Sequence, residues 1–281
     1  MASMLTMLAL ATLSCSVIVD PSAKQCAVDA DCAKLGAAFA GSVCQKNVCV
    51  TPVVEDPLVC KTVDGGAAKT VKLTFTIAFT APPPAAQPFD VVACNRLDVT
   101  CESPVSDHAV ANTGETVELN VPVGFQGYLQ ILNPTAVSAM EFLARPLFED
   151  TAGWNLTIPT DDTLKQLGLA TGTKIDRTLG TVIVVVRDCN RVPLAGATTE
   201  ISVTQGTDSD AGADTSVGFY FANMFPNKSQ MSTTSEGAAG YVNVPIGSAV
   251  LSATVVDSQR ALSPTSAVSR AGWLSYVEVQ P

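Results

Sequence analysis

The nine cysteines constrain what this 281-residue chain can fold into more than any other feature of its sequence. Thiols stay reduced in the cytosol, so this many cysteines are typical of an exported chain that forms disulfides. The count is odd, and we therefore expect one cysteine to have a separate fate while the other eight pair. The nine are Cys15, Cys26, Cys32, Cys44, Cys49, Cys60, Cys94, Cys101 and Cys189.

The N-terminus indicates which cysteine stands apart. Met4 to Leu13 reads MLTMLALATL, which is too short to span a bilayer and fits the apolar core of a secretory signal. Thr12-Leu13-Ser14-Cys15 follows and resembles a bacterial lipobox. That resemblance implies a signal peptide over residues 1–15, lipidation of Cys15 and, because Ser16 follows, anchoring in the outer membrane. The alternative is an ordinary cleaved signal peptide and a periplasmic or secreted protein.

Residues 16–57 form a cysteine-rich segment and a linker. Cys26, Cys32, Cys44 and Cys49 lie too close together in sequence to enclose an apolar core, so we expect two disulfides to hold the segment. Zinc is the competing interpretation, but zinc ligands usually come in C-x2–4-C pairs, often with histidine; the first spacing here, Cys26 to Cys32, is wider, and the only histidine is distant. Of the three pairings open to four cysteines, we favour Cys26 with Cys44 and Cys32 with Cys49. The pattern CAVDADC…CQKNVCV resembles motifs that follow the lipobox in myxobacterial-type lipoproteins.

Composition favours an all-β fold for the rest of the chain. Hydrophobic residues make up 47% and charged residues 15%, which excludes wholesale disorder. Short runs of Val, Ile and Thr between glycines and prolines indicate strands. We expect a first β-sandwich over 58–150, a connector with a short helix over 151–178, and a second β-sandwich over 179–281. The formal charge of −10 excludes nucleic acid as a probable partner.

Two stretches of the chain repeat one another. Glu118–Gly124 reads ELNVPVG and Tyr241–Gly247 reads YVNVPIG, each after a glycine-containing turn and before an apolar strand. The shared context indicates two related sandwiches.

The second half carries motifs that resemble the carboxypeptidase regulatory-like (transthyretin-like) domain. They are Gly180-Thr-Val, then 188–197 (DCNRVPLAGA), then Thr233-Thr-Ser-Glu-Gly237, then 240–247 (GYVNVPIG). The resemblance implies a seven-stranded Greek-key sandwich and no reaction of its own. Pro193 and Pro245 would end strands, and Gly196 and Gly247 would occupy tight turns. Asn190-Arg191 stands where this family usually has glycine.

Three sets of residues were weighed as chemical sites. His108, the only histidine, lies in a polar loop and is interpreted as a surface residue. Asp208, Asp210 and Asp214 form a weak calcium candidate, because Ala211 and Phe219 break the EF-hand pattern. Trp154, Trp273, Tyr220 and Tyr276 would have to share one exposed face to bind sugar rings.

The sequence therefore predicts a non-catalytic cell-envelope lipoprotein with a structural or protein-interaction role. The alternative is a polysaccharide-binding accessory module of the cell surface. We expect no metal and no cofactor, a membrane contact through the lipid anchor, and an envelope protein or polysaccharide as partner. Among the remaining cysteines we prefer Cys94 with Cys101 and Cys60 with Cys189, a pairing that the sequence alone does not fix.

Overall fold

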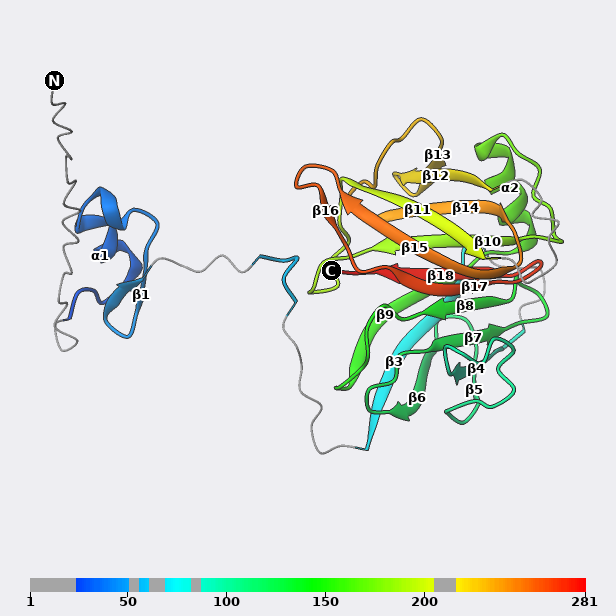
Figure 1. Cartoon of the computed structure of the whole chain (residues 1–281). Coiled ribbons are helices and arrows are strands. Elements are labelled where there is room, and N and C mark those ends of the chain that lie inside the picture. Colours follow the sequence, from blue (N-terminus) through cyan, green and yellow to red (C-terminus); the bar gives the residue numbers. More distant parts are fainter. Residues whose placement is uncertain (1–23, 51–55, 61–68, 82–86, 205–215) are drawn as a thin grey trace, which may run out of the picture. The chain divides into compact units, whose positions relative to one another are not determined.

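A computed structural model describes residues 24–50, 56–60, 69–81, 87–204 and 216–281. The chain divides into two units, one ending at Asp56 and the other beginning at Pro57 (Figure 1). Within the described residues, no helix is both long enough and apolar enough to cross a membrane. Cys15 and the acidic loop with Asp208, Asp210 and Asp214 lie outside the described residues.

The N-terminal unit is small and stapled. It contains the helix α1 (Asp29–Lys34), the 3₁₀ turn η1 (Ala37–Phe39) and a hairpin of β1 (Val43–Gln45) and β2 (Val48–Val50). Lys46 and Asn47 both adopt left-handed φ angles, which gives the hairpin its two-residue turn. The disulfides Cys26–Cys44 and Cys32–Cys49 cross-link the unit, and they are the pairs that the sequence analysis favoured.

The described part of the larger unit is built from strands in three sheets, with one helix, α2 (Asp161–Thr171). A nine-stranded sheet has the order β13-β12-β14-β10-β18-β8-β7-β4-β5, a three-stranded sheet the order β6-β3-β9, and the third sheet contains β11, β15, β16 and β17. The all-β class expected from the sequence is confirmed. The strand bounds are β3 (Thr70–Phe79), β4 (Phe89–Cys94), β5 (Ala109–Ala111), β6 (Thr116–Pro122), β7 (Tyr128–Leu132), β8 (Ala139–Phe142), β9 (Thr151–Ile158), β10 (Gly180–Val186), β11 (Ala197–Thr204), β12 (Val217–Ala222), β13 (Phe225–Asn227), β14 (Ala238–Val244), β15 (Gly247–Val255), β16 (Arg260–Ala261), β17 (Thr265–Ser269) and β18 (Leu274–Val279).

The central strands of the nine-stranded sheet, from β10 to β4, are buried on both faces. Along β4, Val91 and Ala93 join one core while Val92 and Cys94 join the other, as the alternation of a strand requires. The first core also contains side chains of β3, β6, β9 and α2, and the second contains side chains of β11, β15 and β17. The three-stranded sheet and α2 therefore cover one face, and the third sheet covers the other (Figure 1).

The sequence repeat has a counterpart in topology. β3 pairs with β6 antiparallel and with β9 parallel, and β10 pairs in the same way with β14 and β18. In the opposing layers, β7 lies antiparallel between β4 and β8, as β15 lies between β11 and β17. Each half is thus a sandwich of the same plan, and the two copies of the N-V-P-x-G motif occupy equivalent crossovers between layers.

The boundary between the halves differs from the expected connector, and the halves are joined by a shared sheet. The segment 151–158, assigned to the connector, is strand β9, because Trp154, Leu156 and Ile158 alternate with polar residues and complete the first sandwich. The two sandwiches also share a sheet, because β18 of the second pairs in parallel with β8 of the first. The helix of the connector is present as α2, capped by the Thr160 side chain and ended by Gly172 at φ 64°.

The strands β6 and β7, which flank Val123-Gly124, lie in different sheets. β6 pairs with β3, whereas β7 pairs with β4 and β8 in another sheet. Gly124 has φ 79°, and the chain crosses there from one layer to the other.

Two disulfides fix the larger unit. Cys94–Cys101 closes a short loop after β4, and Cys60–Cys189 fastens the start of the unit to the turn after β10. Both are the pairs that the sequence analysis preferred. The Cys189 N–H also donates to the Pro57 carbonyl at 2.9 Å. The segment 56–60, which precedes the first sandwich in sequence, is therefore attached to the second.

Candidate interaction surface

The turn motifs of the second half contact each other. Thr233 is 3% exposed, and its hydroxyl donates to the Leu194 carbonyl at 2.7 Å while accepting from the Ala197 N–H at 2.9 Å. Gly237, at φ 63°, follows in the same turn, and a Cβ there would lie 2.5 Å from the Val186 carbonyl oxygen. These residues therefore join two turns that are distant in sequence, which is a folding role.

Arg191 joins the two sandwiches from a strained turn. It adopts φ 63°, a conformation in which glycine is normally favoured. Its guanidinium lies 4.9 Å from the centroid of the Trp154 ring and donates to Glu278 at 3.1 Å. Because Trp154 belongs to β9, the side chain of Arg191 fastens the second sandwich to the first at the cost of local backbone strain.

Charged side chains gather around Glu278, beside the contact of Arg191 with Trp154. Glu278 is 5% exposed and accepts from Arg187 Nε at 3.0 Å as well as from Arg191. Glu141 lies on β8, and its Cα is the register partner of Tyr276 on β18. Its oxygen Oε2 is buried and has no hydrogen-bond partner among the described residues. Burial and the nearby Glu278 raise the pKa of Glu141 to about 8, so the carboxyl is largely protonated at neutral pH.

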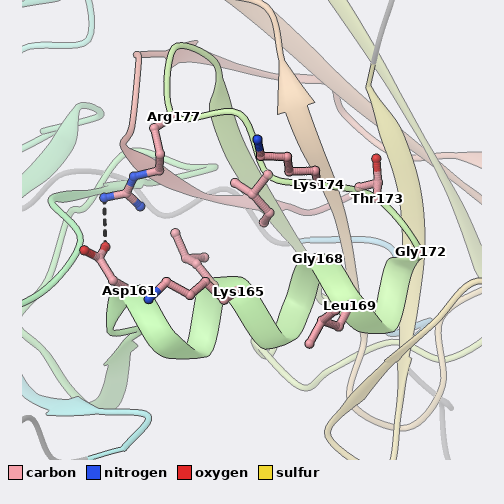
Figure 2. A pocket seen from close by; sticks show the side chains of 10 residues that line it. Asp161, Lys165, Gly168, Leu169, Gly172, Thr173, Lys174 and Arg177 are labelled. Atoms are coloured by element: carbon pink, nitrogen blue, oxygen red, sulfur yellow. Dashed lines mark ion pairs between the residues drawn. The ribbon is translucent and has the colours of Figure 1, made fainter.

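A groove of about 690 Å³ lies between α2 and the segment that returns along it (Figure 2). Gly168 permits this close approach, because a Cβ there would lie 2.8 Å from the Thr173 carbonyl. An ion pair of 2.8 Å between Arg177 and Asp161 bridges helix and segment. The lining is mostly apolar, and Leu169 at its edge is 82% exposed.

The hairpin of β12 and β13 exposes a second apolar group, which we call the hairpin tip: Met224 and Phe225. These residues are 77% and 73% exposed. Asn223 and Met224 form the turn with φ of 52° and 64°, and the Met224 N–H donates to Glu236 Oε1 at 2.7 Å. β13 is the edge strand of the nine-stranded sheet, and Pro226 within it lacks an N–H for a further strand. The tip is therefore held in place with its apolar side chains in solvent.

The remaining residues singled out from the sequence do not converge. His108 Nδ1 lies 2.8 Å from Asp90 Oδ1, and both side chains are exposed. Among the four aromatic residues, Trp154 stacks on Phe75. The guanidinium carbon of Arg270 lies 4.7 Å from the centroid of the Trp273 ring. The hydroxyl of Tyr220 accepts from the Thr199 N–H, and that of Tyr276 donates to the Thr157 carbonyl. The four rings therefore lie in separate contacts, and sugar binding stays a prediction.

Comparison with known proteins assigns no family. No family model matches the chain, and no curated protein matches it. Among solved structures, a Streptococcal ancillary pilin is 14% identical over 75% of this chain and 68% of its own, with a TM-score of 0.24. The shaft pilin SpaA from Lactobacillus rhamnosus GG is 12% identical over 76% and 97%, with a TM-score of 0.23. The Bacillus anthracis TIE protein is 11% identical over 75% of this chain and 34% of its own, with a TM-score of 0.23. These scores are too low to support a conclusion about function.

Proposed function

We propose that this chain is a non-catalytic protein of the cell envelope with a structural or protein-interaction role, anchored as an outer-membrane lipoprotein through Cys15. Its second half is proposed to be a carboxypeptidase regulatory-like module. Support for a structural role comes from the junction of the halves, where one sheet and the Arg191 contact combine two sandwiches. Arg187, Arg191 and Glu278 of that junction are engaged in ion pairs with one another.

The hairpin tip is the single observation that carries the interaction role. Aromatic and methionine side chains are enriched in protein interfaces, and exposed clusters of them mark binding surfaces. Because Pro226 blocks addition of a strand, the partner would have to receive the side chains of Met224 and Phe225 in an apolar pocket. We infer a protein partner on this ground rather than a polysaccharide, which would require aromatic rings arranged as a platform.

Photo-crosslinking in intact cells tests the interaction role. A photoreactive phenylalanine analogue at position 225 is expected to give a discrete adduct with one envelope protein. The matched control is Val110, which is 69% exposed on β5, the edge strand at the opposite end of the same sheet. Equal labelling at both positions, or no adduct at 225, would remove the hairpin tip as an interface.

Membrane fractionation tests the anchor separately. The native chain is expected in the membrane fraction with a lipid-modified Cys15, and Cys15→Ser is expected in the soluble fraction. A Cys15→Ser variant that remains with the membrane would contradict the lipid anchor while leaving the interaction role open to the crosslinking result.

A further inference from the structure

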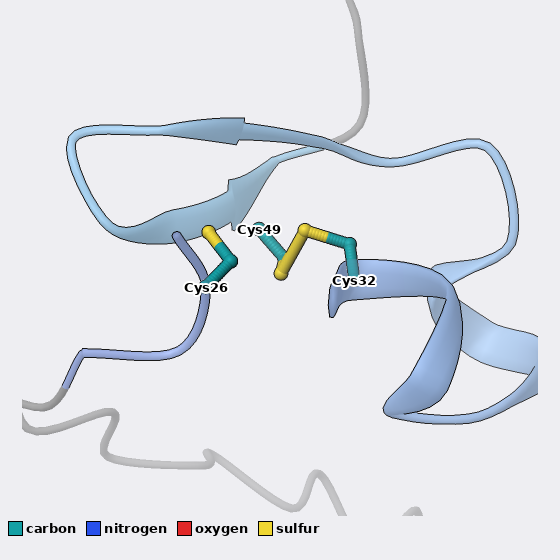
Figure 3. A group of neighbouring side chains, drawn as sticks. All are labelled: Cys26, Cys32 and Cys49. Carbon is teal, nitrogen blue, oxygen red and sulfur yellow. A yellow bond between two sulfur atoms is a disulfide. The ribbon is translucent and has the colours of Figure 1, made fainter. Parts of the chain in front are cut away.

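The sulfur atoms of the N-terminal unit form one cluster. The Sγ atoms of Cys26, Cys32 and Cys49 all lie within 4.8 Å of one another, and Cys44 is bonded to Cys26. Figure 3 shows Cys26 beside the Cys32–Cys49 disulfide. The four cysteines come from the segment before α1, from α1 itself and from the two strands of the hairpin.

Hydrogen bonds that involve no sulfur hold the backbone of these cysteines. The Cys26 N–H donates to the Asn47 carbonyl at 3.3 Å, in the turn of the hairpin. The Cys44 N–H donates to Asp29 Oδ1 at 2.8 Å, and the Cys49 N–H donates to Gln25 Oε1 at 3.1 Å. Cys44 and Cys49 are also register partners across the hairpin. The convergence of the four side chains is therefore specified by the chain around them as well as by the disulfides.

We propose that this cluster, once both disulfides are reduced, is a zinc-binding site that takes one Zn²⁺ through four thiolates. Tetrahedral zinc with bonds of about 2.3 Å places its sulfur ligands roughly 3.8 Å apart. The Sγ atoms of Cys32 and Cys49 are bonded and would have to separate on reduction, whereas Cys26 Sγ already lies within 4.8 Å of both. Cys44 and Cys49 have four residues between them across a hairpin, the upper end of the usual spacing of a zinc-binding cysteine pair. The unit would thus be cross-linked by disulfides when oxidised and by zinc when reduced.

The conversion of the disulfide form into the zinc form takes its electrons and protons from a dithiol reductant. Each disulfide takes two electrons and two protons from one dithiol, which becomes a disulfide itself. The four thiols then release four protons as Zn²⁺ binds, because zinc is held by thiolates. The oxidised unit offers no thiolate and would not bind the metal at this site.

The unit needs one staple or the other. Its buried described side chains are those of Cys26 and Cys32, with Ser42 at the limit, so it has little apolar core. A unit of this kind is expected to unfold on reduction and to refold on metal binding, since binding free energy then becomes folding free energy. The zinc form belongs to the reduced chain, which goes beyond the envelope role proposed above.

A titration of the full-length chain with Co²⁺, followed by Zn²⁺, tests the site. After reduction with a phosphine in metal-free buffer, one Co²⁺ per chain is expected to give the visible bands of tetrahedral thiolate coordination, and one Zn²⁺ should displace it. Alkylation followed by mass mapping is expected to show that Zn²⁺ protects Cys26, Cys32, Cys44 and Cys49. The oxidised chain should show neither effect.

Two double variants make the result specific. Cys32→Ser with Cys49→Ser should weaken metal binding by at least about 100-fold, because it removes two of the four ligands. Cys94→Ser with Cys101→Ser, which removes a disulfide of the other unit, should bind as the native chain does. A reduced native chain without stoichiometric tetrahedral coordination would overturn the proposal, and so would equal binding by the two double variants.

Discussion

The buried carboxyl of Glu141 should make this protein less stable as the pH rises from mildly acidic to mildly alkaline. The ordinary pKa of a glutamate is 4.5, and burial raises that of Glu141 to about 8 in the folded chain. Between these values the unfolded chain carries the ionised carboxylate while the folded chain keeps it protonated. The stabilisation from this group is therefore complete below pH 4.5 and is lost as the pH rises through about 8.

The size of the effect follows from the difference between the two pKa values. One pKa unit corresponds to about 1.4 kcal/mol, so a fully buried group would contribute a loss of roughly 5 kcal/mol. Oε2 is buried, but the residue as a whole is partly exposed. We therefore expect a loss of about 3 kcal/mol between pH 5 and pH 8, after allowing for this contact with solvent. Glu278 adds to the shift, and Arg187 and Arg191 oppose it.

Glu141→Gln tests this expectation, because the amide keeps the shape of the acid and does not titrate. Denaturant unfolding followed by tryptophan fluorescence should find the variant close to the native chain at pH 5. At pH 8 the variant should be more stable by about 3 kcal/mol. The matched control is Glu118→Gln, at an exposed glutamate paired with Lys72, which should leave the pH dependence unchanged. Parallel pH profiles of the native chain and Glu141→Gln would refute the reasoning.

Two further predictions concern the staples and the turns. Removing Cys60–Cys189 by paired serine substitutions should cost about 5 kcal/mol, against about 2 for Cys94–Cys101, because in the chain-entropy model the bridges span separations of 129 and 7 residues. Denaturant unfolding measures both, and equal costs would contradict the entropic argument. Gly237→Ala should cost at least 2 to 3 kcal/mol, whereas Gly196→Ala, also at positive φ but with no atom within 4 Å of its Cβ, should cost about 1 to 2 kcal/mol. Thermal unfolding compares the two variants. Equal losses of stability would contradict the claim that a Cβ at Gly237 clashes with its surroundings.

Local patterns in the sequence were sufficient to predict most individual elements. The alternation in Val71–Thr80 indicates β3, and Thr160 and Gly172 mark the ends of α2 through their capping roles. The short loop between Cys94 and Cys101 favours their disulfide, which is present. These features depend on neighbours in sequence, which is why they can be read without the fold.

The junction of the halves could not be predicted in this way. The pairing of β8 with β18 joins strands more than a hundred residues apart, and neither strand carries a local signal for its parallel partner. The contact of Arg191 with Trp154 joins residues that only the fold brings together. Likewise, the exposure of Met224 and Phe225 depends on a turn held by Glu236 rather than on their residue types.

The central claim is that sulfur crosslinks hold this protein together in an oxidising compartment. The direct measurement is alkylation of native protein purified without reductant, followed by non-reducing peptide mapping. The account predicts four linked peptide pairs, Cys26–Cys44, Cys32–Cys49, Cys60–Cys189 and Cys94–Cys101, with these eight cysteines protected from the reagent. Alkylation of several of these cysteines in the native material would contradict it.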